Sequence, residues 1–463
     1  MLRKNDVLKV TIEDINHLGM GVARHEGMVI FVRGGVTGDV LNIKIIKVAK
    51  DYLVAIITEI IEPSPYRAEP ECPSFKRCGG CIYSHVSFEY ENTLKRGRVE
   101  NEFRRFGIKD VNVLPVLYAN EKEYRNKLQC PVSESGEMGF YAQKSHDIIP
   151  LSSCSLQEDL TAPIFKFLSS YFKAHPIPAV KHVYLRCGKA TGEVMVCFVC
   201  KDKAFKEENS LAGEIVERFK NVKSVILNHN PKDTNVILGD KCRVIYGSES
   251  ITDILCGLKF VISPLAFYQV NHDCTELLYS AAAKAANIQP DETVCDLFCG
   301  IGTVGLCINA MTPAKKLIGV EIIPEAIENA KQNAALNGVD NAEFYCSAAE
   351  DFRFERPDVL IVDPPRKGLA PKLIEYIGSL LPERIVYISC SPDTLARDCD
   401  MLMKYGYTFK DVQPVNMFPR TAHVESIVCL SREKADDYIR ISVQTKDLKR
   451  KETVCQEVNE DEK

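Results

Sequence analysis

The sequence contains neither a segment long enough to span a membrane nor a recognisable export signal. No apolar run reaches the roughly 20 residues that a transmembrane helix needs. The first residues, MLRKNDVLKVTIEDINHLGMG, alternate apolar and polar side chains and include no apolar signal-peptide core. We therefore expect a cytoplasmic protein that makes no contact with a membrane.

An excess of basic charge is also missing. The formal net charge is -5, which is not typical of a nucleic-acid-binding protein, so a polyanionic partner would need local basic patches. One candidate patch is residues 95–98, KRGR, followed by Arg104 and Arg105. A solvated helix face without a partner would have the same sequence.

Cysteine is abundant, with 19 residues. Without an export signal, thiols, metal ligands or a catalytic thiol are better explanations than disulfides. Most of the cysteines lie in apolar segments and are typical of small buried side chains. Cys72, Cys78 and Cys81 have the spacing of metal ligands, and Cys154 is the best candidate for a fourth. Spacing alone leaves zinc, an iron–sulfur cluster and a redox disulfide open.

The length of 463 residues suits about two to four domains. Residues 1–62 alternate in short segments with glycine-rich turns, which predicts a small OB-like β-barrel, a shape often used for oligonucleotides. Prolines follow, and residues 63–266 predict a mixed α/β central domain that includes an amphipathic helix over 87–106. Residues 433–463 are charge-rich without periodicity and predict a loose tail.

Residues 267–432 alternate strand patterns, such as 316–321 and 384–389, with helix patterns, such as the one from Thr275 to Ala286, which predicts a doubly wound, open parallel sheet. The segment Asp296-Leu-Phe-Cys-Gly300-Ile-Gly302 ends a strand and opens a helix. Its glycines allow a tight turn and a close approach of the backbone to a ligand. Glu321 ends the next strand, where an acidic residue can bind ribose hydroxyls. This arrangement serves dinucleotides and S-adenosylmethionine alike.

The motif Asp363-Pro-Pro-Arg366 favours S-adenosylmethionine. It follows an apolar strand, and its two prolines stiffen a loop that presents a carboxylate and a guanidinium at the carboxyl edge of the sheet. A related loop serves amino-methyltransferases, so the motif indicates methyl transfer more clearly than the atom that is methylated.

Cys390 ends an apolar strand and directly precedes a predicted helix that begins Ser391-Pro392. The partial positive charge of a helix N-terminus stabilises a thiolate, so we expect a lowered thiol pKa. Local geometry alone fits an ordinary buried cysteine equally well. Methylation of uracil at C5 gives such a thiol a role, because a thiolate that adds to C6 makes C5 nucleophilic, and a base must then remove the C5 proton. Glu425, at the start of the last apolar strand, is a candidate base, although by itself it could be a surface carboxylate.

Five motifs together resemble the RNA (uracil-5-)-methyltransferase family over nearly the whole chain, up to about residue 432. They are Phe267-Tyr-Gln-Val-Asn271, Asp296–Gly302, Asp363–Arg366, Ser389-Cys-Ser-Pro-Asp-Thr-Leu-Ala-Arg-Asp398 and Met417-Phe-Pro-Arg-Thr-Ala-His-Val-Glu425. The resemblance implies Cys390 as the nucleophile and Glu425 as the base. The residues that it implies at the S-adenosylmethionine site are Gln269, Phe298, Gly300, Glu321 and Asp363, and Gln269 or Asp363 could also face the target base.

The N-terminal barrel resembles the TRAM domain of the ribosomal-RNA branch of this family. That implies 23S ribosomal RNA as substrate, with transfer RNA as the alternative. Family members with this cysteine pattern carry a [4Fe–4S] cluster, so the resemblance implies one on Cys72, Cys78, Cys81 and Cys154. The helix near 87–106 is expected to pack on the catalytic domain. Thr303 and Ala348 stand where some members have asparagine, which weakens the case for polar cofactor contacts there.

The target uridine must leave its stack to reach the thiol and the methyl donor, so we expect a flipped base or a single-stranded loop. The candidate phosphate contacts are Arg125 and Lys127, with Lys95, Arg96 and Arg98. We expect the protein to act as a monomer. An amino-methyltransferase and a non-catalytic RNA-binding or assembly protein remain alternative interpretations of the same fold.

Overall fold

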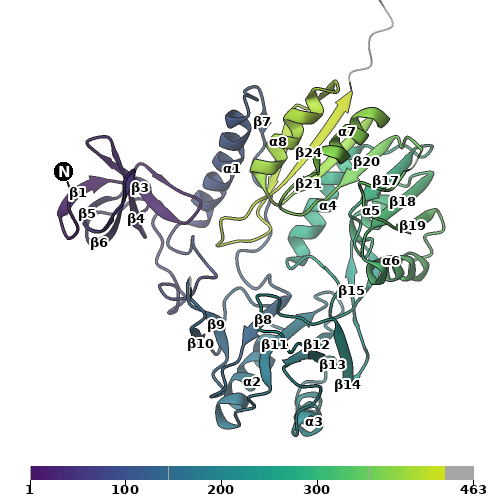
Figure 1. The fold of residues 1–463 in the computed structure, drawn as a ribbon, viewed down its shortest axis with the longest axis horizontal. Coiled ribbons are helices and arrows are strands. Elements are labelled where there is room, and N and C mark those ends of the chain that lie inside the picture. Colours follow the sequence, from purple (N-terminus) through teal and green to yellow (C-terminus); the bar gives the residue numbers. More distant parts are fainter. Residues whose placement is uncertain (1, 144, 354, 433–463) are drawn as a thin grey trace, which may run out of the picture. The chain divides into compact units, whose positions relative to one another are not determined.

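The computed structural model describes residues 2–432, apart from residues 144 and 354. The tail predicted at 433–463 lies outside the described residues. Figure 1 traces the chain from the N-terminal strands through a central α/β region to a C-terminal sheet flanked by helices. Among the described residues, no helix has both the length and the apolar character that crossing a bilayer requires.

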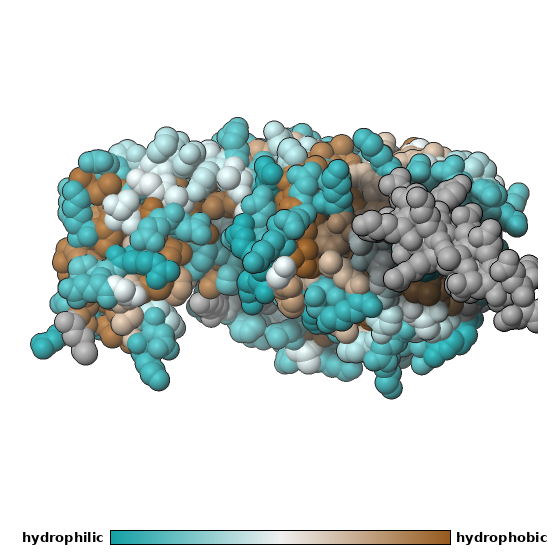
Figure 2. Space-filling view, turned by 90° about the horizontal axis from the view of Figure 1, so that it is seen from above, coloured by the Kyte–Doolittle hydropathy of each residue, from teal (hydrophilic) through white to brown (hydrophobic). Residues whose placement is uncertain are grey.

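The N-terminal region is one curled sheet of six strands, ordered β1-β5-β6-β4-β3-β2. Neighbouring strands are antiparallel except for β4 and β6, and β1 also contacts β3, which indicates the curl. Side chains alternate along β5 between buried and partly exposed, and the buried ones form a small apolar core. On the face that Figure 2 shows, hydrophobic residues lie between hydrophilic ones. The strands are β1 Val7–Thr11, β2 Asp14–Ile15, β3 Met20–His25, β4 Met28–Arg33, β5 Val40–Val48 and β6 Tyr52–Glu62.

A long helix, α1 (Phe88–Arg105), follows the linker after β6. Ser87 caps it by accepting a hydrogen bond from the backbone of Tyr90. Its apolar side chains Val99 and Phe103 share a buried cluster with side chains of the C-terminal sheet and its helices. The short strand β7 (Asn112–Val113) then joins the edge of that sheet by pairing with β23.

The central region is built on a five-stranded sheet ordered β14-β13-β12-β11-β8. Helices α2 and α3 pack against it through an apolar cluster. Two hairpins, β9–β10 and β15–β16, accompany the sheet. The elements are β8 Lys127–Pro131, β9 Gly139–Tyr141, β10 Ile148–Pro150, α2 Ala162–Ala174, β11 Val180–Cys187, β12 Val194–Cys200, α3 Glu208–Arg218, β13 Val222–His229, β14 Lys241–Gly247, β15 Ile251–Leu255 and β16 Leu258–Ile262.

The C-terminal sheet follows the order β19-β18-β17-β20-β21-β24-β23-β7, with β22 pairing β24 off this path. Strands β17 to β21 are parallel, and β24 lies antiparallel to β21. The strand order reverses between β17 and β20, and ligands in such sheets bind beyond the carboxyl ends of the strands near this point. The elements are α4 His272–Ala286, β17 Thr293–Leu297, α5 Thr303–Met311, β18 Lys316–Glu321, α6 Pro324–Leu336, β19 Ala342–Cys346, β20 Val359–Val362, α7 Pro371–Leu380, β21 Arg384–Ser389, α8 Pro392–Met403, β22 Tyr407–Thr408, β23 Asp411–Val415 and β24 Glu425–Arg432.

Candidate functional site

The loop between β17 and α5 has an unusual backbone. Gly300 and Gly302 adopt φ values of +54° and +84°, and Gly302 caps α5. Phe298 also has a positive φ, +67°, which strains a residue with a Cβ atom. A strained backbone conformation persists only where the surrounding structure holds it, and such positions are common in active and ligand-binding sites. The loop therefore has the form of a ligand-binding turn.

Glu321, at the end of β18, faces this turn. Its carboxylate accepts hydrogen bonds from the backbone N–H of Gly300 at 3.2 Å and from those of Ile322 and Ile323 at 2.8 and 3.0 Å. These bonds fix the orientation of the carboxylate. The lone pairs that remain could accept the hydroxyls of a ribose, as the sequence predicts.

Asp296 is buried at the end of β17. One carboxylate oxygen accepts the N–H of Gly305 at 2.9 Å, whereas the other is buried with no hydrogen-bond partner in the part of the chain that the structure describes. Burial raises the pKa of Asp296 to about 8. A buried oxygen without a partner needs a donor or a cation, so the residues around this loop fit a nucleoside that carries a positive charge.

Gln269 and Thr303 each have a hydrogen-bond partner within the protein. Gln269 is buried, and its backbone carbonyl accepts a hydrogen bond from the Asn126 side chain at 3.0 Å. Phe267, two residues earlier, is 65% exposed. The Thr303 hydroxyl pairs with that of Tyr279 at 3.2 Å, so it already has a partner within the protein.

Strand pairing explains how Cys390 and Glu425 meet. Ser389 of β21 lies opposite Ser426 of β24 in the antiparallel ladder. One step further along the ladder, Cys390 leaves β21 beside Glu425, the first residue of β24. Figure 1 shows the strands β21 and β24 side by side. Asp363 leaves the neighbouring parallel strand β20 at the same edge. Three candidate site residues that are far apart in the sequence therefore lie together.

The Cys390 thiol does not have the lowered pKa that its place before α8 predicts. Burial, followed by the negative charges of Glu425 and Asp363, raises its pKa to about 11, and only Arg366 opposes them. The helix begins where predicted, at Pro392. The expectation about the pKa is wrong because burial and two carboxylates outweigh the partial charge of one helix end.

The two carboxyl groups are perturbed in the same way. Burial and the charge of Asp363 raise the pKa of Glu425 to about 8, and burial raises the pKa of Asp363 to about 7. A base with a pKa near neutrality is suited to proton transfer at physiological pH. Glu425 is buried, so the alternative of a surface carboxylate does not describe it.

Arg366 connects these groups. Its side chain hydrogen-bonds the Cys390 thiol and lies 3.5 Å from Nε2 of His423. The hydroxyl of Thr394 in α8 donates to the backbone carbonyl of Arg366 at 3.1 Å and so holds the loop against the helix. The contact between Arg366 and the thiol could not be found from the sequence, because no spacing rule links the two positions.

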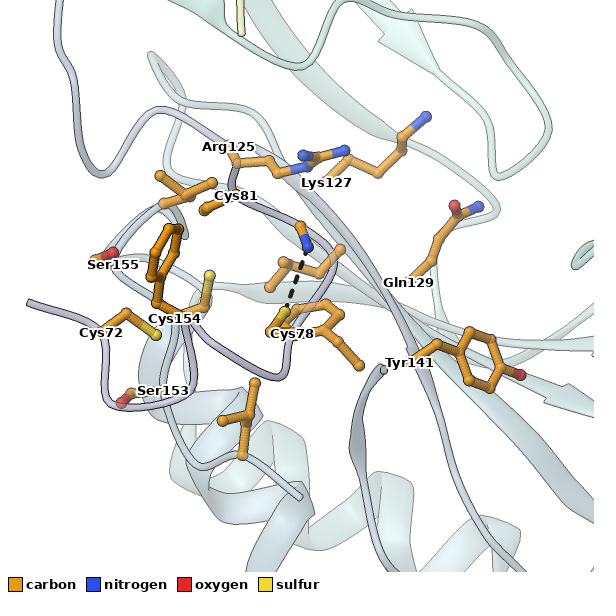
Figure 3. A pocket seen from close by; sticks show the side chains of 16 residues that line it. Cys72, Cys78, Cys81, Arg125, Lys127, Gln129, Tyr141, Ser153, Cys154 and Ser155 are labelled. Carbon is orange, nitrogen blue, oxygen red and sulfur yellow. Dashed lines mark hydrogen bonds between the residues drawn. The ribbon is translucent and has the colours of Figure 1, made fainter. Parts of the chain in front are cut away.

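The four cysteines of the predicted metal site line one pocket with Arg125 and Lys127 (Figure 3). Burial and the neighbouring thiols of Cys154, Cys78 and Cys72 raise the pKa of Cys81 to about 12. Among residues 2–143, 145–353 and 355–432, however, no three His, Cys, Asp or Glu side chains converge closely enough to hold a metal ion. The donor set suits zinc or an iron–sulfur cluster, but the thiols would have to draw together to bind either.

One of the predicted phosphate contacts is wrong. Lys95 is 1% exposed and hydrogen-bonds the side chain of Asn416 at 2.5 Å, so it cannot reach RNA. The basic segment 95–98 predicted an exposed helix face, and nothing in its sequence indicates that Lys95 is buried. Arg98 donates to the carbonyl of Ala422 at 2.7 Å, and Arg96 forms a surface ion pair.

Comparisons with known proteins agree with this architecture. Residues 2–58 match the TRAM domain family, and residues 288–439 match a family of methyltransferase domains. The chain is 42% identical over 451 residues to an uncharacterized RNA methyltransferase of Bacillus cereus (strain ATCC 10987 / NRS 248), covering 93% of this chain and 98% of that protein. An uncharacterized RNA methyltransferase of Halalkalibacterium halodurans is 41% identical over 449 residues, with the same coverage.

A solved structure is similar along most of the chain. It is the Pyrococcus abyssi tRNA (uracil-54, C5)-methyltransferase in complex with S-adenosyl-L-homocysteine, with a TM-score of 0.75 and 25% identity. The match covers 91% of this chain and all of that one. The family resemblance is thus confirmed: the chain belongs to the S-adenosylmethionine-dependent RNA methyltransferases and joins a TRAM domain to a methyltransferase domain.

Proposed function

We propose that this protein methylates C5 of a uridine in 23S ribosomal RNA, with Cys390 as nucleophile and Glu425 as base. The observation that carries the proposal is the meeting of a thiol, a buried carboxyl group of raised pKa and a guanidinium beyond β20, β21 and β24, the sheet that also bears the glycine loop. An amino-methyltransferase would need neither Cys390 nor Glu425. A non-catalytic assembly protein would need none of these groups.

S-adenosylmethionine supplies the methyl group on a positively charged sulfur when it is bound. The Cys390 thiol gives its proton to solvent and its sulfur adds to C6 of uracil, which removes the C5–C6 double bond and makes an enolate over C5, C4 and O4. C5 then bonds the methyl carbon as the bond between that carbon and the donor sulfur breaks. Glu425 then takes the proton from C5, and cleavage of the bond between sulfur and C6 restores the ring and the thiolate. Arg366 stabilises that thiolate each time it forms.

The other residues hold the ligands. Glu321, Gly300 and Phe298 bind the nucleoside part of the donor. Gln269 and Asp363 hold the donor or the edge of the flipped base. Transfer RNA is a second candidate substrate, because the solved structure with a similar fold is a tRNA (uracil-54, C5)-methyltransferase. The TRAM domain favours ribosomal RNA through its resemblance to that branch.

The test is methylation of 23S ribosomal RNA and of transfer RNA, with mass-spectrometric mapping of the product. RNA carrying 5-fluorouridine at the mapped site should then form a covalent adduct with the protein, because fluorine cannot leave C5 as a proton. The Cys390→Ala protein should form no adduct and transfer no methyl group, whereas Cys242→Ala, at an exposed cysteine of the central sheet, should behave as the unaltered protein. Methylation by Cys390→Ala would refute the proposal.

We propose in addition that Cys72, Cys78, Cys81 and Cys154 hold a [4Fe–4S] cluster. The support is four thiols around one pocket in a protein whose location is predicted to be cytoplasmic. Protein purified without oxygen should contain about four iron and four acid-labile sulfide atoms per chain if the cluster is complete. Stoichiometric zinc without sulfide would overturn this proposal.

A further inference from the structure

The segment that leads into Glu425 is held by other parts of the chain at almost every residue. Residues 416–424, the base loop, connect β23 to β24 without regular secondary structure. Its carbonyl groups nevertheless accept hydrogen bonds one after another. The donors are the Cys274 thiol to Asn416, Asn271 to Met417, Lys95 to Phe418, Tyr124 to Pro419 and Arg98 to Ala422.

Arg420 shows the same pattern through the backbone. Its carbonyl accepts the N–H groups of Ile82 at 2.8 Å and Tyr83 at 3.1 Å, directly after the cysteine-rich segment. Its φ of +68° is a strained value for a residue with a side chain. The guanidinium donates to Glu121 at 2.6 Å. The strain indicates that interactions with distant segments, rather than local preference, set the path of the loop.

Glu91 and Lys95 of α1 lie at the centre of this arrangement. They form an ion pair of 2.8 Å with both side chains fully buried. Lys95 also donates to the Asn416 side chain at 2.5 Å and to the Phe418 carbonyl at 3.0 Å. Glu91 accepts from the Asn416 side chain at 3.0 Å and from the Arg420 N–H at 2.9 Å.

A fully buried ion pair usually contributes little to the net stability of the fold. Desolvation of the two charges can exceed their attraction, and apolar residues of similar volume are often as stable or more so. Here, Glu91 and Lys95 together form four hydrogen bonds with residues of the base loop. No other described element supplies as many side chains to residues 416–420 as α1 does.

We propose that Glu91 and Lys95 are positioning residues that set the location of Glu425 for removal of the C5 proton. This inference rests on the proposed function. Neither residue touches the candidate substrate site; both act through the base loop. Cys390 follows β21, the strand paired with β24, and none of the hydrogen bonds of Glu91 and Lys95 given above ends on β21 or on Cys390, so we expect its addition to C6 to depend less on the pair than proton removal does.

Lys95→Met should therefore slow the removal of the C5 proton without slowing adduct formation or methyl transfer. With uridine-containing RNA, the variant should form the covalent adduct and transfer the methyl group into it, but should release the C5 proton on the order of 100-fold more slowly, as expected for a misplaced catalytic group. The adduct should then accumulate on denaturing gels, and Glu425→Gln should accumulate it as well. Tritium release from RNA labelled at uridine C5 measures the slow step.

Lys331→Met is the matched control, because Lys331 forms a helical pair with Glu328 at 2.9 Å on the exposed surface. It should match the unaltered protein in every readout. The inference is overturned if Lys95→Met also matches the unaltered protein in every readout. It is also overturned if Lys95→Met loses adduct formation and S-adenosylhomocysteine binding together with proton release, because that pattern reports general disruption.

Tyr124→Phe keeps the test decisive should Lys95→Met not fold. It removes one hydroxyl, which donates to the Pro419 carbonyl at 3.0 Å. We expect the same pattern with a smaller loss, and equal slowing of all steps would contradict the inference. If the unaltered protein forms no adduct even with 5-fluorouridine RNA, the proposed function itself has failed, and that outcome is distinct from those above.

Discussion

The Cys390 thiol lies among two carboxyl groups and one guanidinium, and their charges oppose one another. Its raised pKa, about 11, makes the thiol rather than the thiolate the main form near neutral pH in the protein without ligands. The thiol is therefore protected from adventitious reaction. Any change that adds positive charge or removes negative charge nearby should activate it.

The rate at which iodoacetamide alkylates Cys390 should depend on the charges near the thiol, because they set its pKa. Glu425 is charged only above its own pKa of about 8, so in Glu425→Gln the thiol pKa should fall and alkylation should become faster at a pH between about 8 and 10. In Arg366→Gln the opposing positive charge is removed, so the pKa should rise and alkylation should slow. The modified peptide is quantified by mass spectrometry across pH. Equal pH profiles for the three proteins would contradict this account.

Binding of the methyl donor should release protons. Folded Asp296 and Asp363 have pKa values raised to about 8 and 7, so near neutral pH Asp296 is mostly protonated and Asp363 partly protonated. A sulfonium cation nearby favours the carboxylates and lowers both pKa values, so donor affinity should increase as pH rises from about 6 to 9. S-adenosylhomocysteine has a neutral sulfur and should depend less on pH. Calorimetry in buffers of different ionisation enthalpy measures the protons directly.

At the scale of elements, periodicity predicted much of the C-terminal sheet. The strands predicted at 316–321 and 384–389 are β18 and β21. The helix predicted from Thr275 begins instead at His272, because the side chain of Asn271 accepts the Cys274 N–H and caps it. The strand β2 has two residues, too few for a period to show. Short elements depend on partners far away in the sequence, which no local pattern encodes.

Helix α1 offers a prediction about its own stability. Gly97 lies inside the helix, and a Cβ atom there would meet nothing within 4 Å. Gly97→Ala should stabilise the protein by about 0.5–1 kcal/mol, because alanine loses less backbone entropy in a helix. Gly107 is the control: its φ of +80° makes alanine strained, so Gly107→Ala should destabilise by about 1–2 kcal/mol. Denaturant titration measures both, and changes of the same sign would be inconsistent with this reasoning.

At the scale of the whole molecule, the candidate site is assembled from segments that the sequence keeps far apart. The motifs pointed to Cys390, Glu425 and Asp363 because each follows or begins an apolar strand, and two adjoining ladders, β20–β21 and β21–β24, bring them together. The role of Glu91 and Lys95 could not be predicted, because a Glu–Lys pair four residues apart on a helix is typical of an exposed face. Their burial depends on a loop more than 300 residues later in the chain, with which they share hydrogen bonds.

RNA binding should depend on the basic residues beside the cysteine pocket. Arg125 and Lys127 both line it. The double variant Arg125→Glu/Lys127→Glu should weaken RNA binding and reduce its salt dependence by about one unit of slope for each phosphate that is no longer neutralised. Affinity for the methyl donor should stay the same. Filter binding at several salt concentrations provides the measurement, and an unchanged slope would exclude these two residues as phosphate ligands.

The hydrogen-bonded path of the base loop has a consequence for how the enzyme chooses among nucleotides. Six carbonyl groups of the base loop accept hydrogen bonds, so we expect the loop to keep its path when RNA binds. We then expect the RNA to change shape instead, and a uridine already unstacked from its neighbours should enter at the lowest free-energy cost. Local deformability of the RNA should therefore contribute, together with base identity, to the choice of the target nucleotide.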